Sequence, residues 1–244
     1  MCVLLQRRFG TPLQNWPRIK LLLNRYKKGY KRKTASIFTL SEIKRALELP
    51  YSGPKWIMRK AALAVAYCGC LRAADVRKIE MGNVTIDTEG VWVEFVQSKQ
   101  RGEETKNRFL VPHQTFGSHI VKYLDLLEKS LPCRPPNSPM FMRATTKGYN
   151  DQPMGEKMLR NITKDVARLL GLEKPETYTG HTCRRSGATQ AAGAGATSLM
   201  LKGQCGWVQE QTAMKYIGVY FYHVIQVDPS QSFGSTEFKS KVVF

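Results

Sequence analysis

Residues 178–189 read YTGHTCRRSGAT. His181 and Arg184 are three positions apart, so on a helix their side chains project from one face about one turn apart. Gly180 directly precedes the pair and indicates a helix N-terminus, where main-chain N–H groups also favour an anion. A guanidinium and an imidazole that converge there suit a phosphate. The pair alone is weak evidence, because most His-x-x-Arg pairs are surface or structural residues.

Two aromatic residues extend this pattern towards the C-terminus. Trp207 follows Arg184 by 23 positions, and Tyr216 follows Trp207 by nine. Together with residues 178–189, they resemble the C-terminal signature of tyrosine recombinases, the phage integrase family. In that family a His-x-x-Arg is followed by Gly-His or Gly-Trp and then by a nucleophilic tyrosine, at the spacings found here. The Tyr-Thr-Gly-His and Gly-Trp forms are most similar to recombinases of eukaryotic Crypton-type mobile elements.

The resemblance implies two further site residues upstream. An arginine that closes the helix before the sheet, followed three positions later by an acidic residue, is matched by Arg72 and Asp75. A catalytic lysine in the hairpin between the second and third strands is matched by Lys99, with Lys106 as the second choice. The likeness then covers residues 38–217, and the shared order and spacing of its motifs make it specific.

The resemblance also implies what each residue does to a phosphodiester. Arg72 and Arg184 stabilise the negative charge, because a guanidinium stays charged and binds two phosphate oxygens together. His181 positions the phosphate or assists the proton transfer of the nucleophile, and Trp207 donates its indole N–H and packs the site. Lys99 protonates the leaving 5′ oxygen as the general acid.

Tyr216 is implied to be the nucleophile that forms a covalent 3′-phosphotyrosine, so neither a metal ion, ATP nor another cofactor is expected. Only spacing selects it over the nearby Tyr220 and Tyr222. The site residues also have ordinary interpretations. Arg72 could be a cation at a helix C-terminus with an acidic partner, Trp207 a core residue, and the hairpin lysine merely solvated.

The charge of the chain independently favours a polyanionic partner. The sequence has 38 Lys and Arg against 19 Asp and Glu, a formal net charge of +19 and a pI near 9.8. Such an excess favours nucleic acid or an anionic membrane surface. No stretch approaches the roughly 20 apolar residues of a membrane span, and the first apolar run is too short for a signal peptide. We therefore expect double-stranded DNA as the partner, with no membrane and no small-molecule substrate.

Cysteine and histidine spacing argues against a metal site. No pair among the 6 cysteines has the two-residue gap of a zinc knuckle, and the 4 histidines lack helical ligand spacing. Free thiols in a reducing compartment are the simplest interpretation, and no metal is expected.

Hydrophobic periodicity predicts a mainly helical α+β domain with one small three-stranded antiparallel sheet, consistent with a tyrosine recombinase catalytic domain. A capping box, Thr39-Leu-Ser-Glu42, opens the first helix, and Pro54 opens the second. A period of two predicts strands at 84–86, 91–96 and 108–111, with 97–107 as a hairpin loop. Further helical segments are predicted at 115–131, 155–170, 182–192, 197–202 and 209–216.

We expect three regions along the chain. Residues 1–36 would be a basic helical remnant of an N-terminal, core-binding region and its linker. Residues 37–218 would be the catalytic domain, and residues 219–244 a tail that family members exchange between protomers of a tetramer, or else a disordered one. The residues expected to contact DNA are Arg25, Lys27, Lys28, Lys31, Arg32, Lys33, Arg101 and Arg185. A solvated basic tail is the alternative for the first six. Because complete family members have a larger N-terminal domain, we expect weak stand-alone recombination with retained cleavage.

The leading hypothesis is a site-specific recombinase or integrase that cleaves and rejoins DNA for the integration or transposition of a mobile element. The alternative is a domesticated, catalytically silent DNA-binding domain of a chromatin or transcription protein. A type IB topoisomerase uses similar residues, but the spacing of Arg184, Trp207 and Tyr216 favours the recombinase. A metal-dependent nuclease would need a carboxylate triad that the sequence does not suggest. A nuclear location is expected if the protein is eukaryotic, and a cytoplasmic one otherwise.

Overall fold

The computed structural model describes Leu21 and residues 34–98, 104–205, 207, 209–214 and 216. The chain divides into two units, Met1–Thr34 and Ala35–Phe244, and the helices and strands from α3 to α9 lie in the second. The basic helical remnant predicted at residues 1–36 lies outside the described residues as far as position 33, except for Leu21. In the part of the chain that the structure describes, no helix is long and apolar enough to cross a membrane.

Helix α3 (Leu40–Glu48) begins at the predicted capping box. The hydroxyl of Thr39 accepts from the main-chain N–H of Glu42 at 3.2 Å, and the Glu42 carboxylate accepts from the N–H of Thr39 at 2.7 Å. These two bonds satisfy main-chain donors that a helix start leaves without an intrahelical partner. The prediction of this helix start is confirmed.

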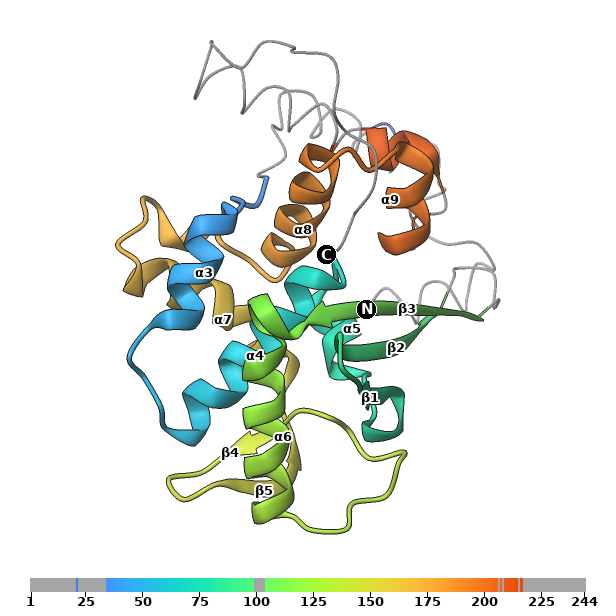
Figure 1. Cartoon of the computed structure of the whole chain (residues 1–244). Helices are drawn as coiled ribbons and strands as arrows, with labels where there is room; N and C mark the ends of the chain where they lie inside the picture. Colours follow the sequence, from blue (N-terminus) through green and yellow to red (C-terminus); the bar gives the residue numbers. More distant parts are fainter. Residues whose placement is uncertain are drawn as a thin grey trace. The chain divides into compact units, whose positions relative to one another are not determined.

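Helix α4 (Pro54–Cys68) is the centre of the domain (Figure 1). Pro54 opens it, as predicted, because a proline at the first helical position loses no hydrogen bond. From Ala61 to Cys68 every residue is buried, and α6, α7 and α8 all pack against the helix. A helix that is apolar all round must be covered on every side, which explains its central position.

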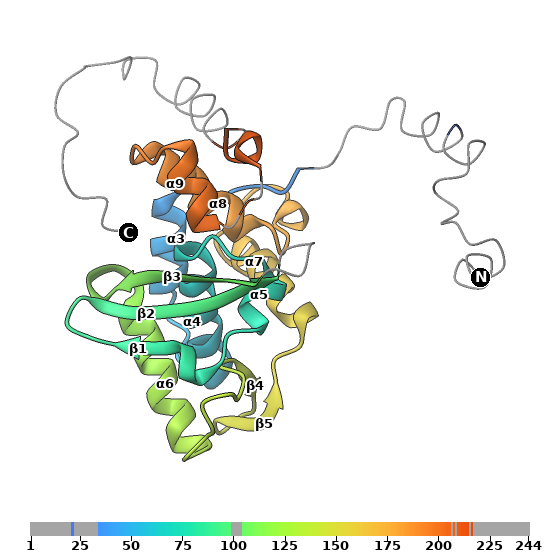
Figure 2. The same cartoon turned by 90° about the vertical axis from the view of Figure 1, so that its right-hand side faces the viewer.

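The predicted three-stranded antiparallel sheet is present, in the order β1 (Val84–Ile86), β2 (Gly90–Ser98), β3 (Glu104–Pro112). Figure 2 shows the sheet facing the viewer, with α4 behind it. Val91, Val93 and Phe95 alternate with exposed or half-exposed residues, which turns one face of β2 towards the core.

The predicted hairpin loop at 97–107 is too long. Ser98 pairs with Glu104, so the ladder continues through polar residues and the connection is residues 99–103. A ladder is held by main-chain hydrogen bonds, and it can therefore extend beyond the apolar pattern that revealed it.

The chain between the sheet and the last helices contains one feature that the sequence analysis missed. A π-helical turn (η3, His113–Gly117) leads into α6 (Ser118–Ser130), and a second sheet of β4 (Met142–Ala144) and β5 (Tyr149–Pro153) follows. Strand β5 (YNDQP) does not alternate apolar and polar residues, so no period of two reveals it in the sequence. Helix α7 (Glu156–Leu169) then agrees with the prediction at 155–170.

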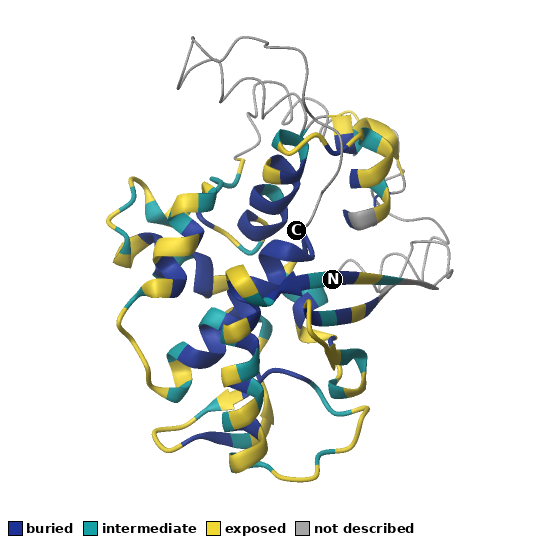
Figure 3. Cartoon of the chain, viewed as in Figure 1, coloured by how far each residue is buried: buried dark blue, intermediate teal, exposed yellow. Residues whose placement is uncertain are grey.

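Helices α8 (Thr182–Gly193) and α9 (Ser198–Cys205) close the described part of the domain, followed by helical residues 210–214. In Figure 3 most of α8 is buried. Between α8, α9 and the end of α4 lies a small second core, separate from the main one. Its buried members are Cys70, Ala188, Ala191, Ala196, Leu201, Cys205, Trp207 and Ala213, with Tyr216 packed against them.

Candidate active site

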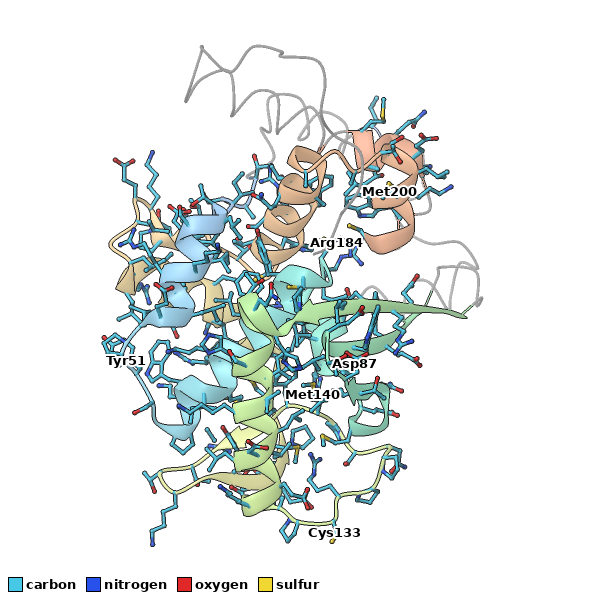
Figure 4. The ribbon with its side chains drawn as sticks, viewed as in Figure 1. Tyr51, Asp87, Cys133, Met140, Arg184 and Met200 are labelled. Carbon is cyan, nitrogen blue, oxygen red and sulfur yellow. The ribbon has the colours of Figure 1, made fainter. Side chains whose placement is uncertain are left out.

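Arg184 is the buried cation of this second core. Arg184 is 3% exposed, and Figure 4 shows its side chain extending from α8 towards α9. One terminal nitrogen donates to the carbonyl of Cys70 at 3.1 Å and the other to the carbonyl of Cys205 at 2.6 Å. Because a guanidinium has five N–H donors in one plane, two such bonds fix its orientation and leave donors for another acceptor.

Trp207 and Tyr216 lie beside this guanidinium. The Cζ of Arg184 is 5.1 Å from the centroid of the Trp207 ring, within the range of a cation–π contact. The Tyr216 ring stacks on Trp207, with centroids 4.6 Å apart and planes 12° apart. The structure therefore brings together the three residues that spacing alone had connected.

Arg72 lies immediately before the short helix α5 (Ala73–Arg77), where its main-chain N–H donates to the Asp75 carboxylate at 3.1 Å. The expectation that it closes the preceding helix is wrong, since α4 ends at Cys68. The alternative that Arg72 is a cation at a helix C-terminus is wrong for the same reason, because Arg72 precedes a helix, where the dipole disfavours a cation. The Arg72 side chain is exposed, and its positive charge acts to lower the pKa of both Arg184 and Tyr216.

His181 is the residue that precedes the first turn of α8, and it is exposed. Its loop is held from both sides. The hydroxyl of Thr163 on α7 donates to the carbonyl of Thr179 at 3.0 Å, and the N–H of Thr179 donates to the hydroxyl of Thr182 at 2.9 Å. Gly180 lies so close to α7 that an added Cβ would be 2.8 Å from Cγ of Arg160. A side chain there would push the loop that carries His181.

The remaining predicted residues divide between the described and undescribed parts of the chain. Lys99, Arg101 and the basic residues of the first 33 positions lie outside the described residues. Lys106 pairs with Val96 in the β2–β3 ladder. Arg185, expected to contact DNA, donates to the carbonyl of Ala35 and so ties α8 to the segment before α3. In the described residues, no three His, Cys, Asp or Glu side chains are grouped as metal ligands.

The electrostatics of this region favour an added anion. Burial lowers the pKa of Arg184, and the neighbouring charge of Arg72 lowers it further, because two like charges repel. Burial raises the pKa of Tyr216, against the opposing effect of Arg184, Arg185 and Arg72. A phosphate placed among these arginines would relieve their repulsion and lie next to a phenol oxygen.

Sequence reasoning missed the groups that hold Arg184. They are main-chain carbonyls of Cys70 and Cys205, and a residue pattern does not reveal where a carbonyl points. Two signals were nevertheless present in the sequence. Gly69 directly follows α4 as its C-cap, and Gly187 lies in the middle of α8. Both indicate a close approach of two segments.

Comparisons with known proteins identify the family and the fold. The phage integrase family matches residues 37–223. No curated protein sequence matches the chain. Among solved structures, XerH site-specific recombinase bound to palindromic difH substrate superposes with a TM-score of 0.60 at 12% identity, over 80% of this chain and 52% of that one.

Two other solved structures have the same fold. XerA recombinase gives a TM-score of 0.59 at 14% identity, covering 80% of this chain and 66% of its own. A lambda integrase dimer bound to a COC′ core site gives 0.51 at 15%, covering 86% and 53%. The chain thus spans between about half and just under two thirds of the length of these three proteins.

Proposed function

The chain belongs to the phage integrase family, and we propose that it is a DNA strand-transfer enzyme whose nucleophile is Tyr216. The observation that carries the proposal is the position of this phenol, stacked on Trp207 and within the electrostatic reach of Arg72, Arg184 and Arg185. A tyrosine that only packs at the end of a helix is not expected to have three arginines opposing the rise in pKa that burial causes.

The reaction follows from the chemistry of these groups. The Tyr216 oxygen attacks the scissile phosphorus, a bond forms between them, and the bond from phosphorus to the 5′ oxygen breaks. Arg184 and Arg72 stabilise the charge that builds on the non-bridging oxygens, and His181 positions the phosphate or takes the phenol proton. Lys99, or in its place Lys106, gives a proton to the leaving oxygen. The 3′-phosphotyrosine keeps the bond energy, so the reverse attack by a 5′ hydroxyl rejoins the strand.

Double-stranded DNA is the proposed substrate, and a tetramer on paired sites the proposed assembly. The net charge of +19 supports a polyanionic partner. The solved XerH and lambda integrase structures are described as bound to difH substrate and as a dimer bound to a core site, respectively. We further propose residues 1–36 as a DNA-contacting arm, 37–218 as the catalytic domain and 219–244 as the exchanged tail. The Tyr-Thr-Gly-His and Gly-Trp forms support a Crypton-like element, hence integration or transposition in a nucleus.

The test uses suicide duplexes nicked next to a randomised segment, because the target sequence is unknown. The protein is incubated with this pool, and adducts that survive denaturant are captured and sequenced. We expect an adduct from the unaltered protein and none from Tyr216→Phe, with equal DNA binding by both. Adduct formation by Tyr216→Phe would reassign the nucleophile. DNA binding without any adduct would favour the catalytically silent DNA-binding domain instead, and relaxation of supercoiled plasmid without strand exchange would favour a topoisomerase.

A further inference from the structure

The carbonyl of Cys70 reaches Arg184 only because the backbone there has an uncommon conformation. Cys70 has φ of +49°, in the left-handed region that residues with a side chain seldom adopt. It lies between Gly69, where α4 ends, and Leu71, whose N–H donates to the carbonyl of Ala66. The chain therefore reverses sharply at this point, and the Cys70 carbonyl accepts from Arg184 rather than from a helical N–H.

Helix α8 reaches the same point because Gly187 has no side chain. A Cβ added there would be 2.2 Å from the carbonyl oxygen of Tyr67 and 2.9 Å from the sulfur of Cys70. The Tyr67 carbonyl oxygen is a main-chain atom, so it cannot move away by a change of rotamer. Gly187 is one turn beyond Arg184 on α8, so the contact that it allows also sets the distance from Arg184 to the Cys70 carbonyl.

We propose that Cys70 and Gly187 are positioning residues of the strand-transfer site, which hold the Arg184 guanidinium at the angle that a scissile phosphate requires. The inference rests on the proposed function, in which Arg184 binds the phosphate. Cys70 acts through its backbone conformation, and Gly187 acts through the close approach of α8 to the end of α4.

A series of substitutions at Cys70 separates positioning from packing. Gly, Ala and Val all remove the thiol, which is hydrogen-bonded to Cys205. They differ in how readily they adopt a positive φ: glycine does so freely, alanine at a cost, and the β-branched valine least of all. Positioning predicts that Cys70→Gly cleaves fastest of the three and Cys70→Val slowest. A merely structural role predicts the reverse order, because glycine leaves the larger cavity in this buried site.

The substitution Gly187→Ala tests the role of the other positioning residue. We expect DNA affinity to stay the same while single-turnover cleavage falls about 100-fold, the effect of a misplacement of about 1 Å. Alanine favours a helix more than glycine does, so the loss cannot come from helix propensity. Gly203→Ala on α9 is the matched control, because its Cβ would have no atom within 4 Å, and we expect unchanged cleavage. The DNA is the sequence recovered from the randomised pool.

A spectroscopic measurement separates this inference from the proposed function. In ¹⁵N spectra of the arginine guanidinium groups, two hydrogen-bonded terminal nitrogens rotate slowly and give resolved signals, which Arg184→Lys assigns by removal. We expect resolved signals in the unaltered protein and in Gly203→Ala, and averaged ones in Gly187→Ala and Cys70→Val. If the protein forms no adduct but these signals behave as expected, the proposed function fails, and Cys70 and Gly187 are shown only to orient Arg184. Resolved signals in Gly187→Ala, or fastest cleavage by Cys70→Val, would overturn the inference.

Discussion

The ring of Tyr216 lies nearly parallel to that of Trp207, with 4.6 Å between centroids and 12° between planes. Trp207 is 7% exposed and also lies beside the Arg184 guanidinium, so a single side chain contacts both the proposed nucleophile and the buried cation. Substitutions at Trp207 should consequently affect cleavage and stability together.

Trp207→Ala removes the stacking partner and leaves a cavity in the second core. We expect the free energy of unfolding to fall by about 3–5 kcal/mol, as for other truncated core aromatics. Trp207→Phe keeps a ring under Tyr216 and should cost less, while adduct formation slows in both variants. Denaturant titration and single-turnover assays measure the two effects. Trp92→Phe, on the outer part of the sheet, is the matched control and should leave cleavage unchanged. Equal cleavage by Trp207→Ala and the unaltered protein would contradict the role of the stack.

Arg184→Lys keeps the positive charge but replaces a planar fork with a single ammonium group. The ammonium cannot hold the carbonyls of Cys70 and Cys205 at once and still face a phosphate. We expect cleavage to fall by about 10²- to 10³-fold, the cost of one lost oxyanion donor. The carbonyl that the lysine leaves without a donor should also lower the free energy of unfolding, by roughly 1–3 kcal/mol. A lysine variant that cleaved at the original rate would show that charge alone suffices.

The buried thiols of Cys68 and Cys183 should make the fold sensitive to alkali. Burial raises the pKa of each from 9.0 to about 12. Between these values the folded protein keeps protons that the unfolded chain has lost. The free energy of unfolding is therefore undiminished below pH 9 and falls as the pH rises through this window.

Denaturant titrations at about pH 8 and about pH 10.5 measure this effect. Cys133→Ser changes an exposed thiol and should leave the pH dependence as it was. Tyr67 acts in the same direction as the two thiols, since burial raises its pKa as well. Stability that increased over this interval would contradict the assignment.

The capping box of α3 offers a direct check of the fold. Thr39→Ala removes the hydroxyl that accepts from the Glu42 N–H and should lower the free energy of unfolding by about 1 kcal/mol. Thr39→Ser keeps that hydroxyl and should retain most of the stability. If serine were as damaging as alanine, packing of the threonine methyl group would be responsible instead.

Binding to DNA should depend steeply on salt. A protein that contacts six to ten phosphates loses about 10³- to 10⁵-fold in affinity between about 50 and about 200 mM salt, because bound counterions are released. We expect a slope in this range for a chain with a net charge of +19. Fluorescence anisotropy with a labelled duplex measures it. Affinity that did not change with salt would rule out phosphate contacts as the main source of binding.

The sequence allowed much of the fold to be predicted because local rules determined it. Thr39, Glu42 and Pro54 mark helix starts through hydrogen bonds within a single turn. The sheet followed from alternating apolar residues. The full length of its hairpin did not, because main-chain pairing continues past Val96 through polar residues. The β4–β5 sheet was missed because β5 (YNDQP) does not alternate apolar and polar residues.

For the site, spacing identified residues but could not describe how they are held. It selected Arg184, Trp207 and Tyr216, which the structure brings together. It assigned Arg72 to the wrong helix end, because α4 already ends at Cys68 and Arg72 precedes α5. The left-handed conformation of Cys70 has no signature in residue type, since residues with a side chain seldom adopt it.

The two carbonyls that hold Arg184 are 135 positions apart in the chain, at Cys70 and Cys205. The orientation of Arg184 therefore depends on α9 as well as on the turn after α4. If α9 opened locally while the rest of the domain stayed folded, the guanidinium would lose the Cys205 carbonyl and keep that of Cys70.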